Sequence, residues 1–167
     1  MVDEGADKSD LIASYYTGQT YFVETGCGRA AETLQRVEER ELFDHAFSIE
    51  VDHFNYLMGL ENTWRLNNVT LIHSGSEYLS MFLDFWKEEP CLFCLDAHST
   101  DPNAYTPIRE ELAAIFYQPW GHTILIDDAR LFDEWPAWPD LSWVLAEAEA
   151  NGFDHEVKDD VIRLVPR

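Results

Sequence analysis

Short apolar runs alternate with longer mixed segments along most of this 167-residue chain. The apolar runs are Tyr21–Val23, Ala46–Ile49, Val69–Ile72, Cys91–Leu95 and Thr123–Ile126. The segments of helical length between them include Ala30–Arg40, Phe54–Leu66, Glu77–Lys87 and Ile108–Tyr117. Continuous apolar strands that alternate with helices are typical of a parallel sheet whose two faces are both covered. The alternation therefore predicts an α/β fold with a doubly wound, mostly parallel sheet.

The C-terminal part departs from this alternation. Leu141–Ala150 has the composition of a helix, and Asn151 and Gly152 after it are typical of a helix C-terminus. Two short apolar segments follow, His155–Val157 and Val161–Val165. Because so few residues separate them, they predict a C-terminal antiparallel hairpin added to the parallel sheet.

Length and composition predict one domain over residues 21–167, preceded by a polar N-terminal arm over residues 1–20. The chain has 32 acidic against 11 basic residues and a formal net charge of −21. Such a surface repels phosphate backbones and anionic lipids, so we expect neither a nucleic-acid nor a membrane partner. The polar N-terminus and the lack of a long apolar run predict a cytoplasmic protein. The acidity fits either solubility or adaptation to high salt.

The chain has three cysteines, and two of them, Cys91 and Cys94, form a CxxC motif inside the apolar run CLFCL. Residues three apart in an extended strand point to opposite faces of the sheet. A zinc site would also need a second pair of ligands. We therefore interpret Cys91 and Cys94 as buried thiols.

Glycines and acids follow the first two predicted strands. Gly26 and Gly28 lie in ETGCGR, between a strand and a helix, where glycine permits a tight turn and close approach of a ligand. A turn without a ligand is the alternative. Glu50 ends the second strand and is placed to bind the two hydroxyls of a ribose, while Asp52 is the expected N-cap of the next helix. After the third strand, Ser74 or Ser76 caps a helix, or Ser76 contacts an adenine edge.

Three aspartates follow the fourth and fifth strands. Asp96 comes directly after Cys91–Leu95, and Asp127 and Asp128 come directly after Thr123–Ile126. Adjacent carboxylates repel one another, so something must offset their charge. The three oxygen donors predict a site for Mg²⁺ or Ca²⁺. The alternative gives Asp128 a helix-capping role and Asp127 a hydrogen-bonded role, with Arg130 neutralising the pair.

The ordered segments ETGCGR, FSIEVD, LIHSGSEYL, LFCLDAH and ILIDDAR resemble the class I S-adenosylmethionine (SAM)-dependent methyltransferases, over about Tyr21 to Phe132. They are most similar to metal-dependent O-methyltransferases of the catechol, caffeoyl-CoA and sugar types, and also to small proteins with an LDAH plus IDDAR pattern. The resemblance implies a Rossmann-like methyltransferase fold and two sets of site residues. It assigns SAM binding to Glu24, Gly26, Gly28, Glu50 and Ser76, and Mg²⁺ binding to Asp96, Asp127 and Asp128.

The catechol-type enzymes place a lysine base shortly after the strand-four aspartate, whereas His98 lies there in this chain. An imidazole titrates near neutral pH, so His98 is the expected base and Asp96 its catalytic partner. Trp135 and Trp138 either form one wall of the substrate pocket or simply pack on a helix. We therefore expect metal-assisted O-methylation of a small hydroxylated substrate. A homo-oligomer is one assembly compatible with the sequence.

Two other functional classes fit parts of the pattern. One is a non-catalytic domain of the same fold that binds a nucleoside or SAM, or that mediates an interaction. It does not explain a cluster of three carboxylates. The other is a Mg²⁺-dependent hydrolase or phosphotransferase, which is less favoured because the chain has no P-loop pattern.

Overall fold

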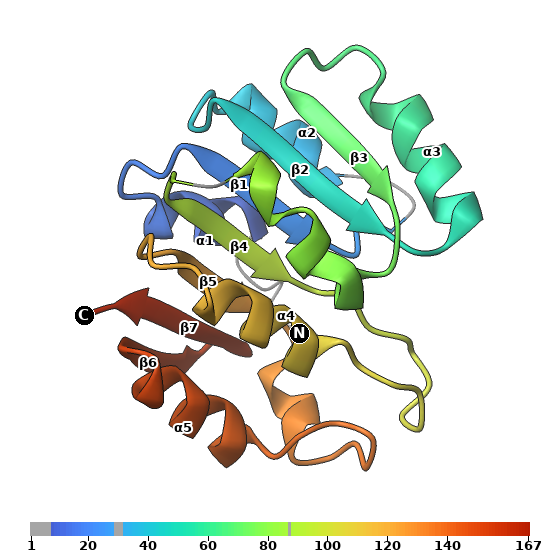
Figure 1. The fold of residues 1–167 in the computed structure, drawn as a ribbon. Coiled ribbons are helices and arrows are strands. Elements are labelled where there is room, and N and C mark those ends of the chain that lie inside the picture. Colours follow the sequence, from blue (N-terminus) through green and yellow to red (C-terminus); the bar gives the residue numbers. More distant parts are fainter. Residues whose placement is uncertain (1–7, 29–31, 87) are drawn as a thin grey trace, which may run out of the picture.

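A seven-stranded sheet forms the centre of the molecule in the computed structural model, which describes residues 8–28, 32–86 and 88–167 (Figure 1). Along the sheet the strand order is β3-β2-β1-β4-β5-β7-β6. The strands are β1 (Tyr21–Thr25), β2 (His45–Glu50), β3 (Val69–His73), β4 (Cys91–Leu95), β5 (Thr123–Ile126), β6 (Phe153–Lys158) and β7 (Val161–Pro166). The first five pair in parallel, and β7 pairs antiparallel with both β5 and β6. This confirms the predicted mostly parallel sheet with a C-terminal hairpin.

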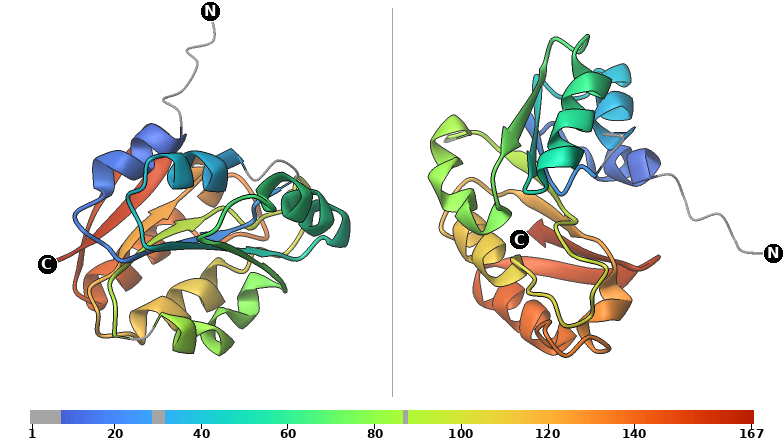
Figure 2. Two further views of the ribbon diagram at one scale, coloured as in Figure 1. Left: turned by 90° about the horizontal axis from the view of Figure 1, so that it is seen from above. Right: turned by 90° about the vertical axis from the view of Figure 1, so that its right-hand side faces the viewer.

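Two layers of helices cover the sheet (Figure 2). One face carries α1 (Lys8–Tyr15), α2 (Glu32–Glu39) and α3 (His53–Thr63). The other face carries the 3-10 helices η1 (Ser76–Met81) and η2 (Leu83–Phe85), together with α4 (Ile108–Phe116) and α5 (Leu141–Ala150). A third 3-10 helix, η3 (Ala129–Phe132), follows β5.

The alternation of side chains along each strand divides the core in two. In β4, Phe93 and Leu95 pack on the side of α4 and α5, while Leu92 and Cys94 pack on the side of α1 and α2. All four are at most 2% exposed, which explains why the strand is apolar on both faces. Cys91 and Cys94 fall on opposite sides and are both free, buried thiols, as predicted.

Three predicted segments differ in detail. Residues 8–15 of the predicted polar arm form α1, whose Ile12 is fully buried, while residues 1–7 lie outside the described residues. The helix predicted over Glu77–Lys87 is instead two 3-10 helices, η1 and η2, with a non-helical backbone conformation at Tyr78 inside η1. Lys87 lies outside the described residues. Ala30 and Ala31, predicted to start a helix, also lie outside them.

The helices in the described part of the chain are all too short or too polar to span a membrane.

Candidate functional site

The turn after β1 packs directly against the turn after β4. Gly26 and Gly28 have φ values of +80° and +58°, a region that glycine enters without steric cost. A Cβ atom on Gly26 would lie 2.6 Å from the carbonyl oxygen of Asp96. The Gly26 N–H donates to the carbonyl of Ile49 at 2.8 Å. Gly26 is therefore required both by the backbone conformation and by the close approach of two strand ends.

Glu50 lies at the end of β2, as predicted, and its carboxylate faces the glycine turn. Its side chain is buried, and Oε2 accepts from the N–H of Gly28 at 3.0 Å. Oε1 accepts from the N–H of Asp52 at 2.8 Å. Asp52 in turn caps α3 by accepting from the N–H of Asn55, which confirms its predicted role. Gly26, Gly28 and Glu50 thus lie together on one side of the sheet's carboxyl edge.

The other two predicted SAM-binding residues are buried. Glu24 is 2% exposed within β1, where it accepts a hydrogen bond from the hydroxyl of Ser48 at 3.0 Å. Ser76 is the first residue of η1, and its hydroxyl hydrogen-bonds to the carboxyl of Glu111 on α4. The residue before it, Gly75, occupies the N-cap position of η1 without a side-chain hydrogen bond, so Ser76 is not a helix cap.

Cys27 lies between the two glycines but is a poor nucleophile. Burial, together with the nearby carboxylates of Glu24 and Glu50, raises the pKa of the Cys27 thiol to about 12. The reactive form of cysteine is the thiolate, which is scarce at neutral pH when the pKa is this high. We therefore assign Cys27 no role as a nucleophile.

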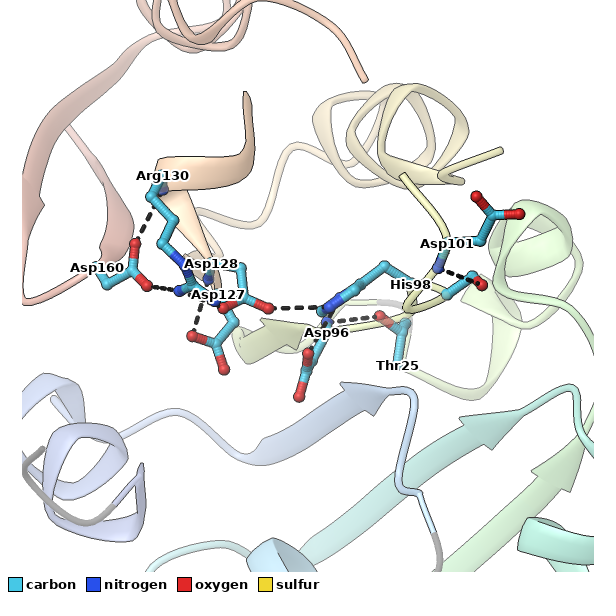
Figure 3. Close-up of polar contacts among 9 residues, drawn as sticks. Thr25, Asp96, His98, Asp101, Asp127, Asp128, Arg130 and Asp160 are labelled. Atoms are coloured by element: carbon cyan, nitrogen blue, oxygen red, sulfur yellow. Dashed lines mark hydrogen bonds and ion pairs between the residues drawn. The ribbon is translucent and has the colours of Figure 1, made fainter. Parts of the chain in front are cut away.

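The ends of β4 and β5 bring Asp96, His98 and Asp128 together (Figure 3). The imidazole of His98 lies between the two carboxylates, with Nδ1 3.3 Å from Asp96 Oδ1 and Nε2 2.9 Å from Asp128 Oδ2. The His98 N–H also donates to the Asp96 carbonyl at 3.1 Å, which tightens this turn. One potential ligand atom from each of these residues lies within 4.8 Å of the others. We call Asp96, His98 and Asp128 the Asp–His–Asp cluster.

Asp127 is not among these three residues. Its Oδ1 accepts from the backbone N–H of Asp128 at 2.9 Å. Asp128 has a left-handed backbone conformation, with φ 56° and ψ 46°, and its side chain does not cap η3. This conformation directs Asp128 toward His98, so the predicted helix-capping alternative for Asp128 is wrong (Figure 3).

The positively charged side chain of Arg130 lies on the outer side of the Asp–His–Asp cluster. Arg130 Nη1 is 2.6 Å from Asp128 Oδ1, and the same group forms an ion pair with Asp160 in the β6–β7 turn (Figure 3). Asp160 also accepts from the backbone N–H of Arg130 at 2.9 Å. Arg130 therefore offsets part of the charge of the paired aspartates, which is the role predicted for it.

Two tryptophans surround His98. The ring of Trp138 lies 5.3 Å from the imidazole and that of Trp135 lies 6.3 Å away, both in edge-to-face arrangements. Trp138 also packs on Phe132 at 4.9 Å and is 9% exposed, so it belongs to the core. The packing alternative therefore describes Trp138, whose ring shields one side of His98 from water.

Glu111 is the polar residue that the sequence analysis missed. It is 1% exposed on α4, and its carboxyl accepts hydrogen bonds from the hydroxyls of Ser76 and Thr25. A signal was present, because Glu111 follows Ile108 by three residues and precedes Ile115 by four, which places it on the inward face of the helix.

No protein-family profile and no curated protein sequence matches this chain. Several solved structures do resemble it. The methyltransferase domain of bacterial CtHen1-CN is 12% identical, with a TM-score of 0.66, over 96% of this chain and 97% of that one. Precorrin-6y C5,15-methyltransferase from Geobacter metallireducens is 13% identical, with a TM-score of 0.64, over 98% and 94%.

A third similar structure is SMU.1697c, a putative methyltransferase from Streptococcus mutans in complex with SAH. It is 13% identical, with a TM-score of 0.62, and the match covers 94% of this chain and 93% of that one. Identities this low establish the fold alone. The chain has the Rossmann-like fold of class I SAM-dependent methyltransferases.

Proposed function

We propose that this chain is a SAM-dependent methyltransferase that methylates a hydroxyl group of a small molecule, with assistance from a divalent cation. The observation that carries this proposal is the placement of two groups at one edge of the sheet. The glycine turn with Glu50 follows β1 and β2, and the Asp–His–Asp cluster follows β4 and β5. In open α/β sheets, ligands bind at this carboxyl edge.

In this proposal the glycine turn and Glu50 bind the cofactor. Backbone at Gly26 and Gly28 permits close approach, and Glu50 accepts hydrogen bonds from the ribose hydroxyls. SAM supplies the electrophilic methyl group. The buried position of Glu50 favours this role, because a carboxylate with few water contacts forms stronger hydrogen bonds to a ligand.

His98 is proposed to accept the proton of the substrate hydroxyl. Asp96 faces Nδ1 and orients the ring, so Nε2 is the atom that accepts the proton. The substrate hydroxyl then replaces the Asp128 carboxylate beside Nε2. The acceptor oxygen becomes more nucleophilic as the proton moves to Nε2. Trp138 shields the ring, which strengthens electrostatic interactions around it.

The donor set of the Asp–His–Asp cluster is compatible with a divalent cation. Two carboxylates and one imidazole suit Mn²⁺ at least as well as Mg²⁺, since Mg²⁺ and Ca²⁺ prefer oxygen ligands alone. A bound cation would lower the pKa of a coordinated hydroxyl. Asp96 and Asp128 would hold it, and a ring nitrogen of His98 used as a ligand would no longer be available as a base.

Melting temperatures measured with Mg²⁺, Ca²⁺ and Mn²⁺ at constant ionic strength test this part of the proposal. A cation that binds the folded state should raise the melting temperature with concentration. Asp128→Asn should weaken the response more than Asp127→Asn, which removes the same charge one residue away. A melting temperature that ignores all three cations would contradict the metal site.

Calorimetric titration with S-adenosylhomocysteine (SAH) tests the cofactor site. Glu50→Ala should weaken binding by about 1.5–3 kcal/mol, the typical value for hydrogen bonds to a charged group. Glu61→Ala, which removes an exposed carboxylate from α3, is the matched control and should bind like the unmodified protein. Absence of SAH binding by the unmodified protein would refute the proposed function.

A non-catalytic domain that binds SAM or a nucleoside remains the second proposal. It is favoured by one observation, which is that both nitrogens of His98 already face carboxylates. Incubation with SAM and a panel of phenolic and sugar hydroxyl compounds separates the two. Binding of SAH without formation of SAH from SAM, for any acceptor and any of the three cations, would favour the binding domain.

A further inference from the structure

Glu111 is a buried carboxyl at the same edge of the sheet, and the proposed chemistry does not use it. The charged side chains that act on it, Glu110 and Glu77, are both acidic. Burial and these neighbours raise the pKa of the Glu111 carboxyl to about 7. Because a buried acid without a cation is costly, its position has to be supported by hydrogen bonds.

Those hydrogen bonds join three segments that are distant in sequence. Ser76 begins η1 after β3, Thr25 ends β1, and Glu111 belongs to α4. Thr25 Oγ1 also accepts from the backbone N–H of Asp96 at 3.3 Å (Figure 3). A continuous path therefore runs from Ser76 through Glu111 and Thr25 to Asp96, and Asp96 contacts His98.

The second oxygen of Glu111 has a different environment. Oε1 is buried and has no hydrogen-bond partner within the described part of the chain. Glu111 lines a small cavity of about 10 Å³ together with Thr106, Asp96 and His98. A cavity of this size with several polar groups in its wall accommodates about one water molecule.

We propose that Glu111 is a positioning residue of this site: one carboxyl oxygen orients the hydroxyls of Ser76 and Thr25, and the other accepts a hydrogen bond from one water molecule held in the cavity beside Asp96 and His98. This arrangement connects the proposed SAM-binding side of the sheet edge, at Ser76, with the side proposed to bind the methyl-accepting substrate, at His98. The inference rests on the proposed methyltransferase function, which is what assigns these two ligands to the two sides.

The imidazole signals of His98 in a two-dimensional ¹H–¹⁵N spectrum test the coupling without any ligand. Glu111→Leu removes both hydrogen-bonding oxygens, so we expect the His98 signals to shift. Glu111→Gln retains an acceptor and a polar group toward the cavity, so its His98 signals should match those of the unmodified protein. Thr25→Val breaks the same path with little change in volume, and it replaces Glu111→Leu if that variant does not fold.

The proposal would be overturned if the His98 signals do not shift in Glu111→Leu. If Glu111→Leu does not fold, unshifted signals in Thr25→Val would overturn it. Equal shifts in Glu111→Gln and Glu111→Leu would also overturn it, because the hydrogen-bond acceptor retained by glutamine would then make no difference to His98.

Binding of SAH supplies the second measurement. Glu111→Leu should weaken SAH binding roughly five- to tenfold, as for the loss of an ordinary hydrogen bond, and Glu111→Gln should restore it. Gln19→Leu is the matched control, since Gln19 is also buried and hydrogen-bonded, to Thr123, at the opposite edge of the sheet. It should lose stability and keep its SAH affinity.

Unchanged SAH affinity in Glu111→Leu, or an equal loss in Gln19→Leu, would overturn the positioning role. The two proposals fail in distinguishable ways. If the unmodified protein does not bind SAH, the proposed function fails, while the His98 spectra still decide whether Glu111 is coupled to His98.

Discussion

Two acids near the carboxyl edge of the sheet have different electrostatic surroundings. Asp128 is partly exposed and contacts both Arg130 and His98, so the cost of its charge is offset by neighbouring cationic or ionisable groups. Glu111 is buried, contacts hydroxyls, and has acidic residues as its charged neighbours. Burial and these acidic neighbours raise the pKa of the Glu111 carboxyl to about 7, so this group keeps its proton up to neutral pH.

Gly26→Ala should be strongly destabilising. The new Cβ would lie 2.6 Å from a backbone oxygen that cannot rotate away, and the residue would keep a positive φ. Steric overlap and the strained backbone together should lower the free energy of unfolding by about 2–4 kcal/mol. Urea unfolding measures this loss.

Gly152→Ala is the matched control for that prediction. Gly152 has a similar φ of +86°, but a Cβ there would meet no atom within 4 Å. Gly152→Ala should therefore lower the free energy of unfolding only by the cost of a left-handed backbone conformation at alanine, about 1–2 kcal/mol. Equal losses in the two variants would show that the contact between Gly26 and Asp96 is unimportant.

Glu111 should make stability fall as pH rises. Its pKa is about 7 in the folded protein against an ordinary value of 4.5, so the folded state binds the proton more tightly than the unfolded state. The stability that this difference in pKa contributes is fully present below pH 4.5 and is lost as pH rises through 7. The free energy of unfolding changes by about 3 kcal/mol across this range. Glu111→Gln removes this dependence.

Urea unfolding of both proteins between pH 4 and pH 8 measures the effect as a difference. The unmodified protein should lose stability relative to Glu111→Gln as pH rises across this range. A difference in unfolding free energy that stays constant with pH would contradict the raised pKa of the Glu111 carboxyl.

At the scale of elements, the C-terminal hairpin supports the candidate site. Its two turn residues, Asp159 and Asp160, both have positive φ, 52° and 62°, which matches the tight two-residue turns favoured between antiparallel strands. Asp160 then bonds to Arg130, and its carbonyl accepts from the N–H of Ala129 at 2.8 Å. The hairpin therefore connects the edge of the sheet to the 3-10 helix that follows β5.

Asp160→Ala should loosen this connection. Loss of the hydrogen bond and ion pair to Arg130 should cost about 1 kcal/mol and speed amide exchange in η3. Hydrogen exchange monitored by mass spectrometry or NMR detects the change. Asp159→Ala shares the positive φ but contacts Arg163 instead, so it should leave exchange in η3 unchanged. Equal acceleration in both variants would assign the effect to the turn itself.

At the scale of the whole molecule, the net charge of −21 opposes compactness. Added salt should screen this repulsion, because the Debye length falls from about 30 Å at 0.01 M to about 10 Å at 0.1 M. We expect the melting temperature to rise by a few degrees between 10 and 200 mM NaCl. KCl should have the same effect at equal ionic strength, and a melting temperature that falls with either salt would refute the prediction.

Much of the fold could be predicted because its signals are local. The continuous apolar runs predicted β1 to β5, and the Asn151-Gly152 signal marked the end of α5, where Gly152 has a φ of +86°. The segment after β3 was predicted less well. Its apolar residues fit an α-helix, but the segment forms two 3-10 helices. In this conformation Leu79 and Trp86 pack into the core.

Sequence by itself determined the order of strands and helices along the chain and the residues that follow each strand, because periodicity and turn chemistry act between near neighbours. Tertiary structure alone decided which of those residues meet. Pairing of β4 with β5 and the left-handed conformation of Asp128 place that residue, and not Asp127, beside His98. Packing of α4 against η1 brings Glu111 to Ser76 and to Thr25 at the end of β1. The apolar spacing in α4 places Glu111 on the inward face of that helix, but which residues it meets there depends on how the layers pack.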